Sequence, residues 1–276
     1  MKIPKSILFT AKLLEVTSPK LATLFAAKLF TTPIKHKLPK REHEMDAQSS
    51  QLTMSIPAIN KEIVVYKYGK SDKKILLVHG WSGRGTQLVK IADALLKLGY
   101  STISFDAPAH GKSKGKTTLL PEFIASILEI EKQLGPFDFA IGHSLGGMSI
   151  LNAIEKGFKT NKAVTIGSGD IIQDIIDDFV VKLKLKSTIG VKLRDHFETQ
   201  FRVEMDSFSS SRVAKSVTIP ILVIHDNDDT DVNVKAAHHI HKNLNNAELL
   251  ITEGLGHRKI LGNDAVLKNI IKFIQS

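Results

Sequence analysis

The chain has 276 residues, of which 42% are hydrophobic and 24% are charged. This composition excludes disordered, collagen-like and coiled-coil proteins, and the length suits one large α/β domain or two small ones. The sequence contains no cysteine, which excludes disulfides, thiolate metal sites and a cysteine nucleophile. Because the lack of cysteine is typical of a reducing compartment, we expect a cytoplasmic location.

The positive charge is concentrated at the N-terminus. The formal net charge is +10, but residues 1–41 hold nine Lys and Arg residues against one acid, Glu15, so the remaining chain has a net charge of only +2. Nucleic-acid-binding domains usually carry their basic patch on a folded face. We therefore expect no nucleic-acid partner.

Apolar residues in this basic segment recur at steps of three and four, which predicts one or two amphipathic helices broken near Ser18-Pro19. Two interpretations stay open. The helices form a peripheral contact with an anionic membrane surface, or they pack on the main domain with a lysine-rich wet face. Residues 39–50 are polar and charged, and we expect a linker there. The predicted organisation is an extension with linker at 1–50 and a main domain at 51–276.

The main domain alternates short apolar strands with helical segments. This alternation predicts an α/β fold with a mostly parallel sheet covered by helices on both faces. The expected strands lie at residues 62–68, 74–79, 100–105, 137–142, 162–167, 219–225 and 247–252, and the expected helices at 86–98, 118–134, 145–157, 233–245 and 263–275.

An insertion of about fifty residues, 168–217, interrupts the alternation. Its apolar periodicity predicts two or three short helices. Because insertions at the C-terminal edge of a parallel sheet commonly cover the ligand crevice, we expect it to form a small helical cap.

The chemistry is expected at Gly142-His143-Ser144-Leu145-Gly146, which follows an apolar strand and opens an apolar helix. A G-x-S-x-G sequence in that context is typical of a nucleophile elbow. The glycines let the strand and helix backbones approach closely, and the serine is presented at a helix N-terminus that favours negative charge. Ser144 is the candidate nucleophile.

A serine hydroxyl needs a base, and an oxyanion needs backbone donors. His257, in a glycine-containing loop after the last strand, is the candidate base. The loop 226–231 before it offers four aspartates, among which the spacing alone does not choose. The candidate oxyanion hole consists of the N–H groups of Leu145 and Trp81. His238, His239 and His241 lie in a predicted helix without further ligands, so we expect no metal site.

Five segments together resemble the α/β-hydrolase family, in its esterase- and lipase-like branch: HGWSG, FDAPAHGKSKG, GHSLGG, HDNDDTDV and GLGH. The resemblance covers about residues 60–276. It implies the α/β-hydrolase fold, Ser144 as nucleophile, His257 as base, the Trp81 and Leu145 oxyanion hole, and no cofactor. The family's acid stands in G-x-x-D-x-x-V. Val232 takes the valine position, which selects Asp229, although Asp226 replaces the glycine.

These observations predict a serine hydrolase that cleaves a carboxylic ester of a small-molecule acyl substrate through an acyl-enzyme, with Ser144, His257 and Asp229 as the triad. Other acyl substrates stay open: a thioester, a lysophospholipid or monoacylglycerol, a peptide or a lactone. A non-catalytic binding module on the same scaffold is the alternative of a different class.

Overall fold

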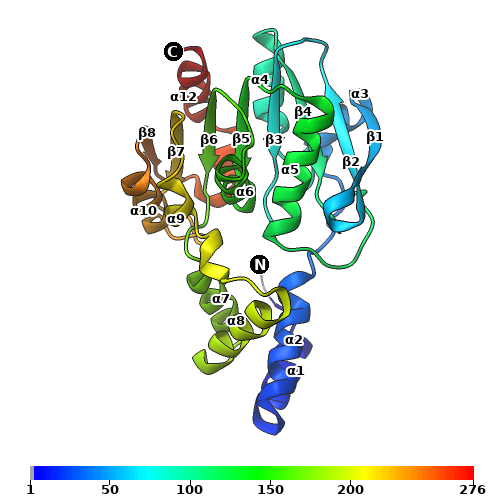
Figure 1. Cartoon of the computed structure of the whole chain (residues 1–276), viewed down its shortest axis with the longest axis vertical. Coiled ribbons are helices and arrows are strands. Elements are labelled where there is room, and N and C mark those ends of the chain that lie inside the picture. Colours follow the sequence, from blue (N-terminus) through cyan, green and yellow to red (C-terminus); the bar gives the residue numbers. More distant parts are fainter. Residues whose placement is uncertain (1–2) are drawn as a thin grey trace.

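An eight-stranded sheet forms the centre of the molecule (Figure 1). The computed structural model describes residues 3–276. Residues 1–2, which include Lys2 of the basic segment, lie outside the described part. The strand order is β1-β2-β4-β3-β5-β6-β7-β8. Within residues 3–276, β2 is the only strand that runs against the others. The strands are β1 Ser50–Ile56, β2 Lys61–Tyr68, β3 Lys74–Val78, β4 Ser101–Asp106, β5 Phe139–His143, β6 Lys162–Ile166, β7 Ile221–Asp226 and β8 Ala247–Thr252.

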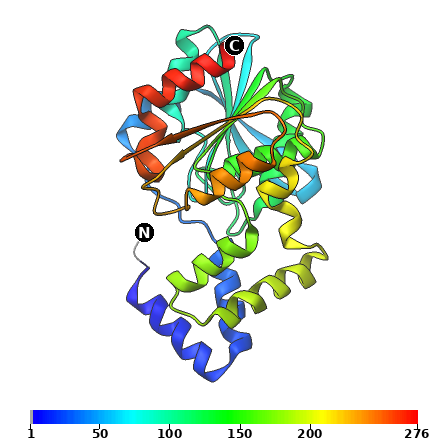
Figure 2. The same ribbon diagram turned by 90° about the vertical axis from the view of Figure 1, so that its left-hand side faces the viewer.

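Helices cover both faces of this sheet, which is seen roughly edge-on in Figure 2. Helices α4 (Val89–Lys97) and α12 (Asp264–Gln275) pack on one face, and α5 (Leu120–Leu134), α6 (Leu145–Glu155) and α10 (Lys235–Asn243) on the other. Central strands such as β3 and β7 are buried along almost their whole length, which explains their continuous apolar sequences. The predicted α/β-hydrolase architecture with a mostly parallel sheet is confirmed.

The insertion between β6 and β7 is helical, as expected. It contains α7 (Ile172–Lys182), α8 (Ser187–Phe201), a 3-10 helix at Met205–Phe208 and the short α9 (Ser210–Ala214). Helices α7 and α8 project from the body beside the N-terminal helices (Figures 1 and 2).

The N-terminal extension folds into a hairpin of two helices, α1 (Lys5–Thr17) and α2 (Pro19–Thr31). Ser18 ends α1 and caps α2 by accepting the Leu21 N–H, and Pro19 occupies the first helical position, as the sequence predicts. The hairpin packs on the insertion: the Phe30 ring lies 5.1 Å from Phe179 and 5.7 Å from Phe197. No helix within residues 3–276 is long and apolar enough to cross a bilayer.

The structure differs from the expected polar linker at 39–50. A 3-10 helix at Lys40–Glu42 and helix α3 (His43–Gln48) occupy this stretch, and β1 follows directly. Glu42 is buried, accepts the Thr86 hydroxyl at 2.8 Å and pairs with Arg84 at 3.2 Å, and the Met45 side chain of α3 is buried as well. Glu42 therefore binds this stretch to the body, through partners about forty residues away that composition alone could not reveal.

Candidate active site

Ser144 stands on a sharp turn between β5 and α6. Its backbone has φ of 52°, a strained value for a residue with a side chain, and its N–H is held by the Ile166 carbonyl at 2.8 Å. The turn depends on Gly146, where a Cβ atom would overlap the Val78 carbonyl oxygen and approach that of His79 to 2.7 Å. Only glycine at this position lets α6 lie this close to β3.

A loop after β3 passes close to this serine. A Cβ atom placed on Gly80 would lie 2.9 Å from Ser144 Cβ, so the next residue, Trp81, is brought to the same place. Its neighbours are tied down on both sides: Gly80 N–H donates to Gln87 at 2.9 Å, and Ser82 N–H donates to His110 Nε2 at 3.0 Å. His110 therefore has a structural role, because it holds the loop that carries Trp81.

The N–H groups of Trp81 and Leu145 are the candidate oxyanion donors. In the part of the chain that the structure describes, neither of them meets a hydrogen-bond acceptor. Leu145 is the first residue of α6, where backbone N–H groups have no intrahelical partner. Unpaired donors next to a serine are what a developing oxyanion requires.

His257 and Asp229 are brought together although 28 residues separate them. His257 Nδ1 lies 2.6 Å from Asp229 Oδ2, which assigns the proton to Nδ1 and leaves Nε2 free to accept one. The two side chains lie over Gly167, where a Cβ atom would approach His257 Nδ1 to 3.2 Å and Asp229 Oδ2 to 3.4 Å. Gly167 follows β6, the strand that also holds the Ser144 backbone.

Asp229 is the only one of the four aspartates at 226–231 whose carboxylate contacts His257 among residues 3–276. Its other oxygen accepts the N–H groups of Asp231 and Val232 at 2.8 and 2.9 Å. Burial alone would raise the pKa of Asp229, but hydrogen bonds from His225, His257 and Val232 outweigh it and hold that pKa well below its ordinary value. The carboxylate therefore stays ionised.

Asp226 holds the loop that carries His257. Its buried carboxylate accepts the Thr252 hydroxyl at 2.7 Å and the N–H groups of Leu255 and Gly256 at 3.1 and 2.8 Å. This role explains why an aspartate can stand where the family pattern has glycine. Sequence reasoning missed it, because the partners lie about thirty residues further along the chain.

Two histidines that the sequence reasoning did not assign support the pair. His225 Nε2 donates to the Val232 carbonyl at 3.0 Å and lies 3.4 Å from Asp229 Oδ2. His143 Nε2 donates to the His257 carbonyl at 2.8 Å, and the two rings are 4.6 Å apart. The sequence signal for a role was position: His225 stands near the end of β7, and His143 directly precedes Ser144. Their partners become visible only in the folded chain.

Ser144 and His257 lie in the same site, but within the described residues no hydrogen bond joins their side chains. Hydrogen bonds between nucleophile and base are often long in unliganded enzymes and tighten when substrate binds. The structure thus brings Asp229 and His257 into contact. Ser144 is held next to this pair by two contacts: its neighbour His143 donates to the His257 carbonyl, and its own N–H donates to a carbonyl of β6.

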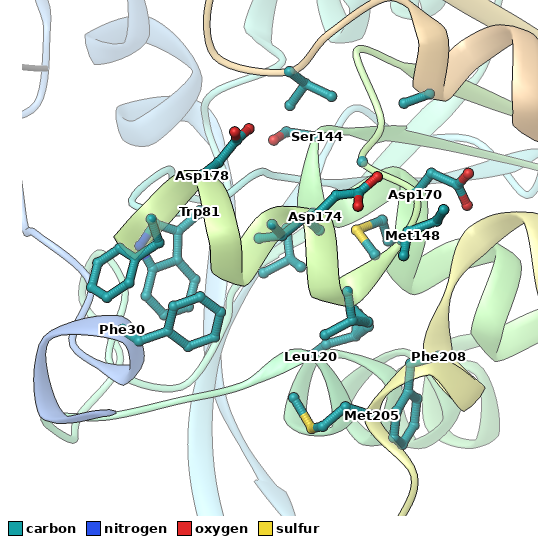
Figure 3. A pocket seen from close by; sticks show the side chains of 18 of the residues that line it. Phe30, Trp81, Leu120, Ser144, Met148, Asp170, Asp174, Asp178, Met205 and Phe208 are labelled. Carbon is teal, nitrogen blue, oxygen red and sulfur yellow. The ribbon is translucent and has the colours of Figure 1, made fainter. Parts of the chain in front are cut away.

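Ser144 opens into a cavity of about 1020 Å³ between the body and the projecting helices. Figure 3 shows Ser144 at one side of it, with Trp81 and Phe30 toward one end and Met205 and Phe208 toward the other. Most of the lining is apolar and comes from the insertion, from α6 and from α2, while acidic residues of α7 such as Asp174 lie along one side. Within residues 3–276 no group of three or more side chains could hold a metal ion.

Comparison with known proteins places this geometry in a family. One family model, described as alpha/beta hydrolase fold, matches residues 73–179, and a second, described as TAP-like protein, matches residues 202–276. The chain belongs to the α/β-hydrolase family. No curated protein matches it. Membership of this family supports a hydrolase activity.

Solved structures with the same fold carry different names. An esterase from Pyrococcus furiosus superposes with a TM-score of 0.67 at 16% identity, covering 89% of this chain and 97% of that one. An esterase from Exiguobacterium antarcticum gives 0.65 at 17%, covering 82% and 100%. A bromoperoxidase from Bacillus anthracis gives 0.63 at 17%, covering 82% and 99%. At these identities the likeness establishes the fold alone, so the reaction has to be argued from the site.

Proposed function

We propose that this α/β-hydrolase cleaves a carboxylic ester with a large apolar acyl group, by a two-step acyl-enzyme route. The observation that carries the proposal is a strained serine at the wall of an apolar cavity. Beside it are two unpaired N–H groups and a histidine whose outer nitrogen is left free by an aspartate. The esterase names of two structural relatives agree with this reaction class.

In the first step, Ser144 Oγ attacks the ester carbonyl carbon while His257 Nε2 takes the hydroxyl proton. Asp229 keeps the imidazole oriented and stabilises its positive charge. The N–H groups of Trp81 and Leu145 stabilise the oxyanion, and each such donor contributes about 3 kcal/mol to lowering the barrier. Collapse of the intermediate breaks the bond to the alcohol, which leaves with the proton from His257.

In the second step, water attacks the acyl-enzyme. His257 Nε2 takes a proton from the water, the oxyanion forms again in the same hole, and collapse releases the carboxylic acid while the proton returns to Ser144 Oγ. No cofactor enters either step.

The cavity supports an apolar acyl group. Its volume of about 1020 Å³ is at the upper end of the range for small-molecule sites. Side chains such as Met148, Ile175 and Phe208 offer few polar partners, so longer acyl chains gain binding free energy by leaving water.

Hydrolysis of p-nitrophenyl esters of increasing chain length tests the proposal. We expect a burst of p-nitrophenol, kcat/KM rising from acetate to longer esters, and loss of activity to background in Ser144→Ala. Ser71→Ala, at a turn remote from the cavity, is the matched control and should retain full activity. Turnover of all esters by Ser144→Ala at the wild-type rate would refute the proposal.

A further inference from the structure

The exposed apolar side chains of this protein are gathered on one part of its surface. Among residues 3–276, ten large hydrophobic side chains are exposed, and nine of them lie within residues 5–34 and 172–201. We call these two segments, which contain α1, α2, α7 and α8, the helical lobe. Leu98 is the one exception on the body. Single exposed apolar residues are ordinary, but a cluster of this kind marks a docking surface.

Helix α1 shows the pattern most clearly. Phe9, Leu13 and Val16 are 71%, 52% and 77% exposed, and their spacing of four and three residues puts them on one stripe of the helix. The opposite face, with Ala11 and Glu15, is buried. The helix therefore has an apolar stripe outside as well as an inner face that packs, and folding explains only the inner one.

Exposed lysines surround these apolar residues. The hairpin exposes Lys5, Lys12, Lys20 and Lys28, and the helical lobe further exposes Lys182, Lys184, Lys186 and Lys192. The only acid in residues 1–41, Glu15, is buried, pairs with Lys12 at 2.5 Å and accepts the Lys186 N–H at 2.6 Å. This contact joins α1 to the turn between α7 and α8, so the lysines of the hairpin and those of this turn lie on neighbouring elements. Segment 172–201 as a whole is neutral, with five acids against five basic residues, but its four lysines all lie at 182–192, a stretch that holds no acid.

We propose that the helical lobe docks on the surface of an anionic lipid bilayer. Apolar side chains surrounded by lysines fit an interface whose headgroups are negative and whose interior is apolar. Charge argues against the other simple occupant, a second copy of this chain facing the first through the same surface, because the lysines of the hairpin and of residues 182–192 would then repel each other. The helices lie on the bilayer, since none described is long enough to span it.

Docking there would set the cavity close to the lipid. Helix α2 exposes Leu21 and Leu24 on its outer side and contributes Leu29 and Phe30 to the cavity wall. A long-chain ester dissolved in the bilayer would then reach Ser144 over a short path. This consequence for the substrate rests on the proposed function, whereas the docking itself does not.

Sedimentation with vesicles tests the docking on the full-length chain, because residues 31–48 bind the body and their removal would disturb it. The Ser144→Ala background keeps the lipids intact. We expect the protein to bind vesicles of equal parts phosphatidylcholine and phosphatidylserine, and this binding should weaken when salt is added. Binding to vesicles of pure phosphatidylcholine should be weaker. The triple variant Phe9→Gln, Leu13→Gln, Val16→Gln should have an affinity for the vesicles at least about tenfold lower. The control Leu98→Gln should bind as well as the Ser144→Ala protein in which these substitutions are made, which we call the parent.

Failure of the parent to bind, or equal binding by the triple variant, would overturn the proposal. So would a concentration-dependent dimer in sedimentation velocity that the triple variant abolishes, since the surface would then belong to a second copy. Hydrolysis of a short soluble ester, measured on the same substitutions with Ser144 intact, separates the two proposals. Intact hydrolysis without vesicle binding refutes the docking alone, and absent hydrolysis with vesicle binding refutes the esterase alone.

Discussion

The four aspartates in the loop after β7 have different roles, which their order in the sequence does not distinguish. Asp226 holds the His257 loop, Asp228 accepts the Gly254 N–H at 2.8 Å, Asp229 contacts His257, and Asp231 lies 3.7 Å from Arg258 near the surface. Their positions in the loop leave all four open, and only the family pattern selects Asp229. The contact with His257 makes Asp229 the expected partner of the base.

Asp229→Asn should therefore lower kcat about a thousandfold or more, because the amide favours the wrong imidazole tautomer and cannot stabilise its positive charge. Asp231→Asn is the matched control and should stay within about threefold of wild type. Steady-state hydrolysis of a p-nitrophenyl ester measures both. Equal losses in the two variants would remove the reason for assigning Asp229.

Three buried histidines make the stability depend on pH. Burial lowers the pKa of His79 to about 4 and those of His110 and His143 to about 3. In the unfolded chain a histidine has a pKa of about 6.5, so between these values the unfolded state binds more protons. The free energy of unfolding therefore rises with pH across this window and falls as the pH drops below about 6.5.

His110→Asn should reduce that dependence by about 1 kcal/mol per pH unit between pH 5 and 6, because one proton no longer distinguishes the two states. Urea unfolding at both pH values measures the slope, and His79→Asn provides an independent second case. A slope unchanged from wild type in both variants would show that these rings do not account for the pH dependence.

At the scale of elements, the elbow between β5 and α6 is set by backbone contacts. The approach of α6 to β3 leaves no space at Gly146, because the obstacles are the carbonyl oxygens of Val78 and His79, which are parts of a central strand and its loop. Such atoms cannot move aside as a flexible side chain would.

Gly146→Ala should accordingly destabilise the protein by about 3 kcal/mol or more, through overpacking and backbone shift. Gly262→Ala is the control, since its Cβ would meet only the Lys90 side chain, at 3.6 Å, and it should change stability by about 0.5 kcal/mol or less. Urea unfolding followed by circular dichroism compares them. A Gly146→Ala protein as stable as Gly262→Ala would contradict this account of the elbow.

The elements that the sequence predicted best are those whose pattern is local. Apolar strands such as β3 and β7, and the break at Ser18-Pro19, were identified because burial and capping leave a signal within a few residues. Helix α3 and strand β1 were missed, since their stability comes from distant partners such as Arg84 for Glu42. The same limit applies to His143 and His225, whose contacts appear only when separate loops meet.

Across the whole molecule, the N-terminal extension is part of the site's enclosure. The Phe30 ring packs on Phe179 and Phe197 of the insertion and lines the cavity. Further along, Ile34 N–H donates to the Ser82 hydroxyl at 3.0 Å, beside the candidate oxyanion donor Trp81. The inner face of the hairpin thus packs on the rest of the protein, which is one of the two interpretations that the sequence left open.

Phe30→Ala should therefore change chain-length preference. We expect kcat/KM for long-chain p-nitrophenyl esters to fall about tenfold, because part of the apolar wall is lost, while acetate hydrolysis stays within about twofold. Leu24→Ala, on the same helix but outside the cavity lining, should leave both rates unchanged. An equal fall for short and long esters would mean that the hairpin does not contact the acyl chain.

The measurement that tests the central claim most directly is covalent labelling with an alkyl fluorophosphonate, followed by mass mapping of the adduct. The account predicts one adduct, on Ser144, in the wild-type protein and none in Ser144→Ala. Absence of an adduct on folded wild-type protein with both a long and a short alkyl probe, or an unchanged adduct in Ser144→Ala, would contradict an activated Ser144.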